Sequence, residues 1–208
     1  MGLRNRSLLT EEEFFFVTTT VKNFTNVFTT DRYCDILINN IKHYQKKYEF
    51  IILGYVIMPN HFHWIVKTAP NKGAISDIMR DIKKYVAWEI LDLLEVESPK
   101  SSTKMVRGNS PKSIITQMSR DIPRQNITSE FRNNVKPGQK RQFWMHRFDD
   151  EVIRNHKMFW AKLKYIHNNP LKADMVSKPE DYKYSSAKNY IMNDNSTIFV
   201  DTTWGGID

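Results

Sequence analysis

The sequence has little cysteine and no long apolar segment. Cys34 is the single cysteine among 208 residues, which excludes an internal disulfide framework and fits a reducing compartment. No apolar run approaches the roughly 20 residues that cross a bilayer, and no apolar stretch of the signal-peptide kind follows Met1. We therefore expect a cytoplasmic protein that does not span a membrane.

What the sequence does contain is typical of a folded domain. Hydrophobic residues make up 40% and aromatic residues 12% of the chain, too much for a disordered protein. A length of 208 residues suits one domain, with or without a large insertion.

Positive charge is in excess and is concentrated. The formal net charge is +8, which is typical of proteins with a polyanionic partner but also of some soluble proteins without one. Residues 98–141 hold only two acidic residues and four of the eight prolines. Ten basic residues lie in this segment: Lys100, Lys104, Arg107, Lys112, Arg120, Arg124, Arg132, Lys136, Lys140 and Arg141. We interpret it as a basic insertion with short, broken structure, including a small helix near 114–118.

Hydrophobic patterning predicts an α+β fold. Strands are expected at 13–22, 50–58, 61–67 and 143–148, and helices at 31–48, 75–95 and 155–168, the last capped by Asn155. An antiparallel sheet with helices packed on it, of ferredoxin-like or RRM-like topology, accounts for this order. From about residue 175 we expect an irregular tail. Lys83, Lys84 and Tyr85 are interpreted as the outer face of the long second helix.

Two histidines on one strand form the first candidate for a functional site. Side chains alternate along a strand, so His61 and His63 project from one face while Phe62 enters the other. Two imidazoles at this spacing can chelate one cation. The pattern alone does not distinguish a metal site from a pair of half-exposed strand histidines.

A tyrosine and an asparagine on the last predicted helix form the second candidate. Tyr165 and Asn169 are four residues apart and so share a helix face. A phenol can attack phosphorus, and an amide oxygen can join a metal site. A helical tyrosine serves packing more often than chemistry, and Asn168-Asn169-Pro170 is also typical of a helix stop, because a residue before proline resists helical geometry.

Taken in order along the chain, these motifs resemble a known family. Met58-Pro59-Asn60-His61-Phe62-His63-Trp64 resembles the HUH motif of single-tyrosine HUH transposases. The segment 165–173 (YIHNNPLKA) resembles the tyrosine helix of their REP-associated branch, and 144–154, 179–182 and 184–187 match it too. The resemblance covers roughly 13–95 and 142–190. The basic segment 98–141 does not align and is longer than the connection expected there.

The resemblance implies an enzyme that cuts single-stranded DNA beside a hairpin through a covalent 5′-phosphotyrosine, leaving a free 3′-hydroxyl. It implies Tyr165 as the nucleophile and Mg²⁺ or Mn²⁺ as the metal, bound by His61, His63 and Asn169. Imidazole ligands make Mn²⁺ the easier chemical fit. A monomer and a homodimer are both compatible with the motifs. We expect six basic residues to contact DNA: Lys136, Lys140, Arg141, Arg147, Lys164 and Lys172.

Two other functions fit parts of the pattern. A non-catalytic RRM-like regulator derived from a transposase would bind nucleic acid, but it would need none of His61, His63, Tyr165 and Asn169. A replication initiator or relaxase shares the HUH chemistry, but the chain has no room for a helicase domain.

Overall fold

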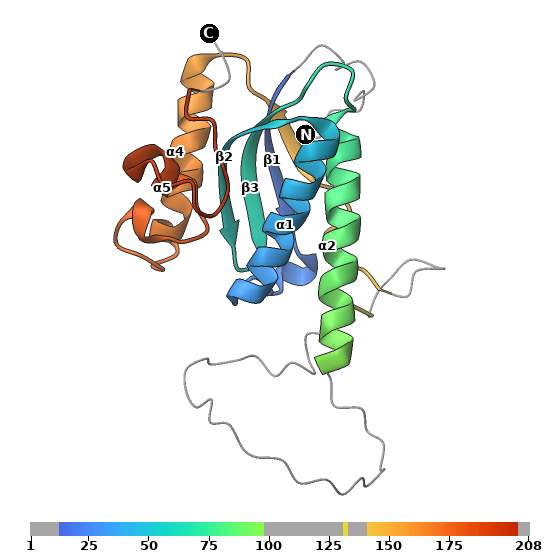
Figure 1. The fold of residues 1–208 in the computed structure, drawn as a ribbon. Helices are drawn as coiled ribbons and strands as arrows, with labels where there is room; N and C mark the ends of the chain where they lie inside the picture. Colours follow the sequence, from blue (N-terminus) through green and yellow to red (C-terminus); the bar gives the residue numbers. More distant parts are fainter. Residues whose placement is uncertain (1–12, 98–130, 133–140, 204–208) are drawn as a thin grey trace, which may run out of the picture.

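A computed structural model describes residues 13–97, 131–132 and 141–203 of the chain (Figure 1). Four strands form one sheet: β1 (Phe14–Thr20), β2 (Ile51–Met58), β3 (His61–Lys67) and β4 (Asp149–Val152). Their order is β2-β3-β1-β4, and every neighbouring pair is antiparallel. This order is the ferredoxin-like arrangement, so the predicted α+β fold is confirmed.

Helices cover both faces of the sheet. On one face α1 (Asp31–Tyr48) and α2 (Ile75–Glu97) lie side by side, and α4 (His156–Lys172) lies on the other (Figure 1). Short helices η2 (Lys22–Phe24), η3 (Pro179–Asp181) and α5 (Ala187–Met192) complete the described elements. None of the described helices is long and apolar enough to cross a membrane.

Strand alternation divides the core into two layers. Phe15 and Val17 of β1 pack in the larger cluster, with α1 and α2. Phe16, between them in sequence, packs with Ile65 and Leu163 in a smaller cluster under α4. His61 and His63 share the strand face of Ile65, because alternate residues of β3 point the same way. The histidine face of the sheet is therefore the face that α4 covers.

Gly54 lets α4 approach the sheet closely. The pairing of β2 with β3 shifts register between Ile52 and Gly54, and a Cβ at Gly54 would stand 2.6 Å from Cδ1 of Leu163 on α4. A side chain at this position would have to displace Leu163, which is buried.

The strand predicted at 143–148 is wrong. The edge strand β4 begins at Asp149, and residues 143–145 lie beside the residues that follow β1, with one isolated antiparallel bridge from Trp144 to Val21. The segment is rich in aromatic residues because Phe143, Trp144 and Phe148 pack into the larger cluster. This composition is also typical of a strand, which explains the wrong prediction.

The helix stop predicted at Asn168 is also wrong, since α4 continues through Pro170 to Lys172. Proline disfavours but does not forbid helical geometry at the residue before it. Hydrogen bonds from Ala173 N to Asn169 O (3.1 Å) and from Met175 N to Pro170 O (3.0 Å) close the last turn. Asn169 is thus inside the helix and not beyond its end. The Asn155 cap is confirmed: its Oδ1 accepts from Met158 N at 2.9 Å.

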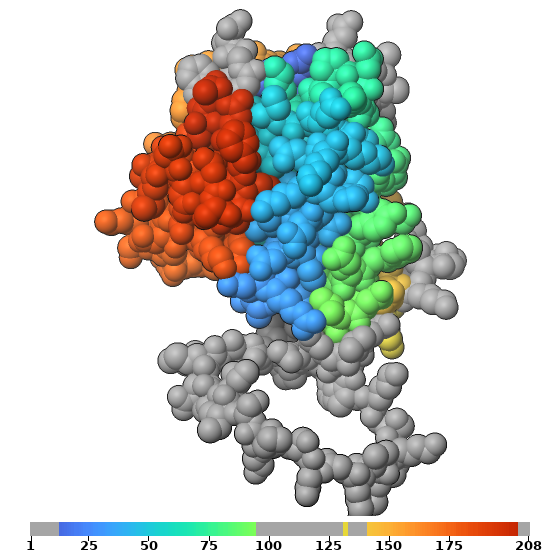
Figure 2. All heavy atoms as spheres, in the orientation of Figure 1, coloured from blue at the N-terminus to red at the C-terminus, as the bar shows by residue number. Residues whose placement is uncertain are grey.

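The C-terminal segment, expected to be irregular, contains η3 and α5 and follows the edge of β2. In two backbone hydrogen bonds, Ile57 N donates to Tyr184 O and Ser186 N donates to Tyr55 O, both at 2.9 Å. In the space-filling view this segment packs against the blue-to-cyan half of the molecule without a break (Figure 2). Most of the predicted insertion at 98–141, including its small helix near 114–118, lies outside the described residues.

Candidate active site

The two strand histidines lie next to each other on the sheet face under α4. The centroids of the His61 and His63 rings are 4.7 Å apart, at an interplanar angle of 74°. In the register of the sheet, His61 is opposite Thr20 and His63 is opposite Thr18 of β1. His63 is buried, with 4% of its surface exposed, whereas His61 is half-buried.

Both rings are held through the nitrogen nearer the backbone. Nδ1 of His61 is 2.6 Å from Oδ1 of Asn60, and Nδ1 of His63 is 2.7 Å from Oγ1 of Thr18. An amide oxygen can only accept, so Nδ1 of a neutral His61 carries the hydrogen. The same tautomer of His63 would donate to the threonine hydroxyl, and Nε2 of both rings would then offer a lone pair to a ligand.

Burial keeps the rings neutral. It lowers the pKa of His63 to about 3, and the electrostatic effects of His61 and Lys162 lower it further. It lowers the pKa of His61 as well. Nε2 of His63 is buried and has no hydrogen-bond partner among the described residues. A buried polar atom without a partner is costly, and a bound cation would satisfy it, so the pair fits a metal.

Tyr165 reaches this pair from α4. Phe159, Leu163 and Ile166 form the buried stripe of the helix, which leaves Tyr165 on the flank of that stripe with 41% of its surface exposed. The centroid of its ring lies 5.2 Å from that of His63. The predicted nucleophile and the two predicted histidine ligands therefore meet within one chain.

Asn169 lies one turn further along α4 and is half-buried. Its Nδ2 donates to the backbone oxygen of Tyr165 at 3.1 Å, a bond within its own helix. That bond leaves Oδ1 as the atom suited to a metal. Among the described residues no group of three or more His, Cys, Asp and Glu side chains could hold a metal ion. The candidate set contains two imidazoles and an amide, and so falls outside such groups.

Two residues at the site were not foreseen. Phe16 stacks on His63, with centroids 5.5 Å apart and an interplanar angle of 18°. The ammonium group of Lys162 lies 4.7 Å from the centroid of the Phe16 ring and forms an ion pair with Glu151 of β4. Lys162 is three residues before Tyr165, a spacing that could have marked it as a neighbour on the helix.

The basic residues predicted to contact DNA are not gathered in one place. The Lys172 ammonium lies 5.5 Å from the centroid of the Tyr165 ring, and Lys164 is exposed on the same helix. Arg147 is exposed just before β4. Arg141 pairs with Asp92 of α2 at 3.2 Å, on the opposite side of the sheet. Lys136 and Lys140 lie outside the described residues.

Comparisons with known proteins find similarity to transposases. The family described as "Transposase IS200 like" matches residues 15–109. A protein of Haemophilus influenzae assigned as a REP-associated tyrosine transposase is 22% identical over 197 residues, covering 95% of this chain and 90% of the relative. The resemblance predicted from the motifs is therefore confirmed over nearly the whole chain.

One solved structure shows the same fold. A REP-associated tyrosine transposase bound to a REP hairpin superposes with a TM-score of 0.58 at 19% identity, covering 95% of this chain and 92% of the other. A protein of Deinococcus radiodurans assigned as a transposase matches at a TM-score of 0.42 and 12% identity, over 76% of this chain and 90% of the other.

Proposed function

We propose that this chain is a metal-dependent transposase that cuts and rejoins single-stranded DNA through a covalent bond to Tyr165. One observation carries the proposal: a half-exposed phenol stands beside an imidazole pair, one ring buried and the other half-buried, whose centroids are 4.7 Å apart. A regulator that only binds nucleic acid has no use for a desolvated Nε2 next to a tyrosine. The similarity to tyrosine transposases supports the same function.

The proposed reaction exchanges one phosphodiester for another. The Tyr165 phenol loses its proton, its oxygen forms a bond to the scissile phosphorus, and the bond from phosphorus to the 3′ oxygen breaks. The 3′ oxygen takes up a proton and leaves as a free hydroxyl, while the 5′ phosphate stays on Tyr165. No water is consumed, so a second 3′-hydroxyl can reverse the step and join new strands.

His61, His63 and Asn169 would hold Mg²⁺ or Mn²⁺. Bound there, the ion would supply Lewis-acid polarisation of the scissile phosphate. The hydrogen bonds that the two rings donate to Asn60 and Thr18 fix the orientation of the rings before metal or DNA arrives, which reduces the reorganisation that binding costs. The ammonium of Lys172 puts positive charge above the Tyr165 ring, where it would attract a DNA phosphate.

The proposed substrate is single-stranded DNA next to a hairpin. This part rests on the REP-associated relatives, one of which is described as bound to a REP hairpin. The excess of basic residues in the chain is compatible with a polyanionic partner.

The test is formation of a covalent protein–DNA adduct. Labelled single strands from the DNA around the gene would be incubated with the protein and Mn²⁺ or Mg²⁺, then separated on denaturing gels. We expect an adduct that chelator abolishes, that Tyr165→Phe lacks and that the control Tyr33→Phe on α1 retains. Tight hairpin binding without any adduct would contradict the proposal and favour a non-catalytic regulator.

A further inference from the structure

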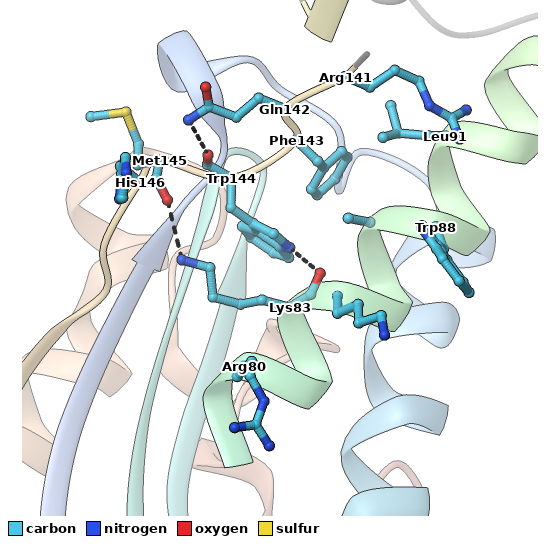
Figure 3. A pocket seen from close by; sticks show the side chains of 12 residues that line it. Arg80, Lys83, Trp88, Leu91, Arg141, Gln142, Phe143, Trp144, Met145 and His146 are labelled. Atoms are coloured by element: carbon cyan, nitrogen blue, oxygen red, sulfur yellow. Dashed lines mark hydrogen bonds between the residues drawn. The ribbon is translucent and has the colours of Figure 1, made fainter. Parts of the chain in front are cut away.

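A pocket of about 560 Å³ lies between α2 and the segment 141–146, on the sheet face opposite the candidate active site (Figure 3). This volume is in the range of small-molecule sites. One wall is α2, with Arg80, Lys84 and Trp88. The other wall is the segment 141–146, with Phe143, Trp144 and Met145.

Hydrogen bonds fix the second wall. The indole Nε1 of Trp144 donates to the backbone oxygen of Lys83 at 2.8 Å, and Nζ of Lys83 donates to the backbone oxygen of Met145 at 3.2 Å (Figure 3). Gln142 donates from Nε2 to the backbone oxygen of Trp144 at 3.1 Å. The pocket is therefore held open by the fold and needs little ordering to accept a ligand.

The pocket combines an exposed aromatic ring with positive charge. Trp88 is 54% exposed, and Nζ of the exposed Lys84 lies 5.3 Å from the centroid of its ring. Arg80 and Arg141 are already ion-paired with aspartates, so Lys84 is the cation best placed for a ligand. None of the described residues that line the pocket is acidic.

Proteins that bind single-stranded nucleic acid do so with aromatic rings that lie beside cations. A base stacks on the ring through its π-face, whatever its sequence, and the adjoining phosphate takes the cation. The apolar floor of Leu91 and Phe143, both buried, suits the flat base better than it suits an isolated phosphate or an acidic peptide.

The pocket adjoins the end of β1 that carries the site on the other face. Met145 N donates to Thr20 O at 2.8 Å, and Thr20 is the register partner of His61. One single strand that passes this end of β1 could therefore contact both places.

From these observations we propose that the pocket between α2 and residues 141–146 binds an unpaired nucleotide of the single-stranded substrate, stacking its base on Trp88 and pairing its phosphate with Lys84. This rests on the proposed function for the identity of the nucleic acid, but not on Tyr165 chemistry. It assigns a binding role to a helix face that the sequence pattern marks only as solvated.

The first test is photo-crosslinking without metal. The full chain would be irradiated with single-stranded oligonucleotides of about ten nucleotides that carry 5-iododeoxyuridine, and digested with trypsin. We expect the crosslink on the peptide that starts at Tyr85 and contains Trp88. Crosslinks confined to other peptides, such as the one with Trp160, would overturn the proposal.

The second test measures affinity by fluorescence anisotropy in the presence of chelator. Trp88→Ala should weaken binding roughly tenfold and Trp88→Phe much less, while Trp160→Ala on α4, also an exposed tryptophan, leaves binding unchanged. Lys84→Gln should lower the slope of log affinity against log salt by about 0.7, and the exposed Lys42→Gln on α1 should not. Unchanged affinity and slope in both pocket variants would overturn the proposal.

Failure of this proposal and failure of the proposed function are distinguishable. A Trp88 crosslink without any Tyr165-dependent adduct would reject the enzyme and keep the pocket. An adduct of normal yield with no Trp88 crosslink would keep the enzyme and reject the pocket.

Discussion

Thr18 is the residue through which β1 controls the orientation of His63. Its hydroxyl is 2.7 Å from Nδ1 of His63, the position that a metal-binding imidazole usually gives to a hydrogen-bond partner. Thr18→Val keeps the shape of the side chain and removes that partner. We expect roughly a 10- to 100-fold loss of Mn²⁺ affinity, measured by calorimetric titration.

The neighbouring threonine provides the control. The hydroxyl of Thr19 is buried on the other face of β1 and has no hydrogen-bond partner among the described residues, so Thr19→Val should leave Mn²⁺ affinity unchanged. Equal losses in both variants would mean that the effect is one of strand packing, and no loss in either would mean that Thr18 does not orient a metal ligand.

At the residue scale, motifs in the sequence predicted the histidine pair and the tyrosine but not the residues that support them. Thr18 is 45 positions from His63, and only the register of β1 with β3 brings them together. Lys162 and Phe16 reach the site from two different elements. No local pattern encodes such contacts, because they depend on strand pairing and helix docking.

Among the elements, α4 positions Tyr165, and α4 itself packs closely on β2 at Gly54, next to the register shift. Gly54→Ala would drive a methyl group into Leu163, which we expect to destabilise the fold by about 1–3 kcal/mol and to lower the adduct rate. Urea denaturation and the adduct assay measure the two effects.

Leu163→Ala tests whether the clash is the cause. Combined with Gly54→Ala, it should cost less than the sum of the two single changes, because the second alanine makes room for the first. Strict additivity of the two free energies would show that Gly54 acts in some other way.

The helices on the other face are joined by a partly buried carboxylate. Asp81 of α2 accepts from Lys47 and Tyr48 of α1 at 2.8 and 2.7 Å, and its side chain is 13% exposed. Burial opposes its charge, but hydrogen bonds from Lys47, Tyr48 and Arg80 outweigh burial and lower the pKa of Asp81 to about 2.

A pKa below its unfolded value stabilises the fold above about pH 4, and this stability is lost as the pH falls towards 2. We expect Asp81→Asn to lower the free energy of unfolding by roughly 2 kcal/mol at pH 7 and to flatten its dependence on pH below 4. The control is Asp77→Asn, an exposed partner of Arg80 in the same helix. If the free energy of unfolding of Asp81→Asn fell with pH below 4 as steeply as that of the wild type, Asp81 would not be the source of the acid sensitivity.

Element boundaries followed from the sequence wherever one pattern acted alone. The helix predicted at 31–48 and the strand predicted at 61–67 have the bounds of α1 and β3. The errors fall at 143–148 and at the end of α4, where burial against α2 and an internal proline conflict with local preference. Tertiary packing decided both cases.

For the molecule as a whole, the structure assembles the candidate site within one chain. The His63 and Tyr165 rings, 5.2 Å apart, belong to the same sheet-and-helix unit. We therefore expect an equimolar mixture of His63→Ala and Tyr165→Phe to form no adduct, measured on denaturing gels against each variant alone. Recovered activity in the mixture would show that α4 is exchanged between two copies.

At this scale the fold class and the similarity to tyrosine transposases could be predicted from the sequence, whereas the pocket between α2 and residues 141–146 could not. Trp88 and Trp144 are 56 positions apart, and they line one cavity only because the segment 141–146 packs on α2. The basic segment 98–141 dominates the charge pattern of the sequence, and of its two described cations, Arg132 and Arg141, only Arg141 lines this pocket.

The central claim is that Tyr165 becomes covalently attached to DNA, and the most direct measurement is mass spectrometry of the digested adduct. Tyr165 should carry the added mass of a 5′-phosphorylated nucleotide after nuclease trimming, and only when Mn²⁺ or Mg²⁺ was present. The same modification on another residue, or its formation in Tyr165→Phe, would contradict the claim.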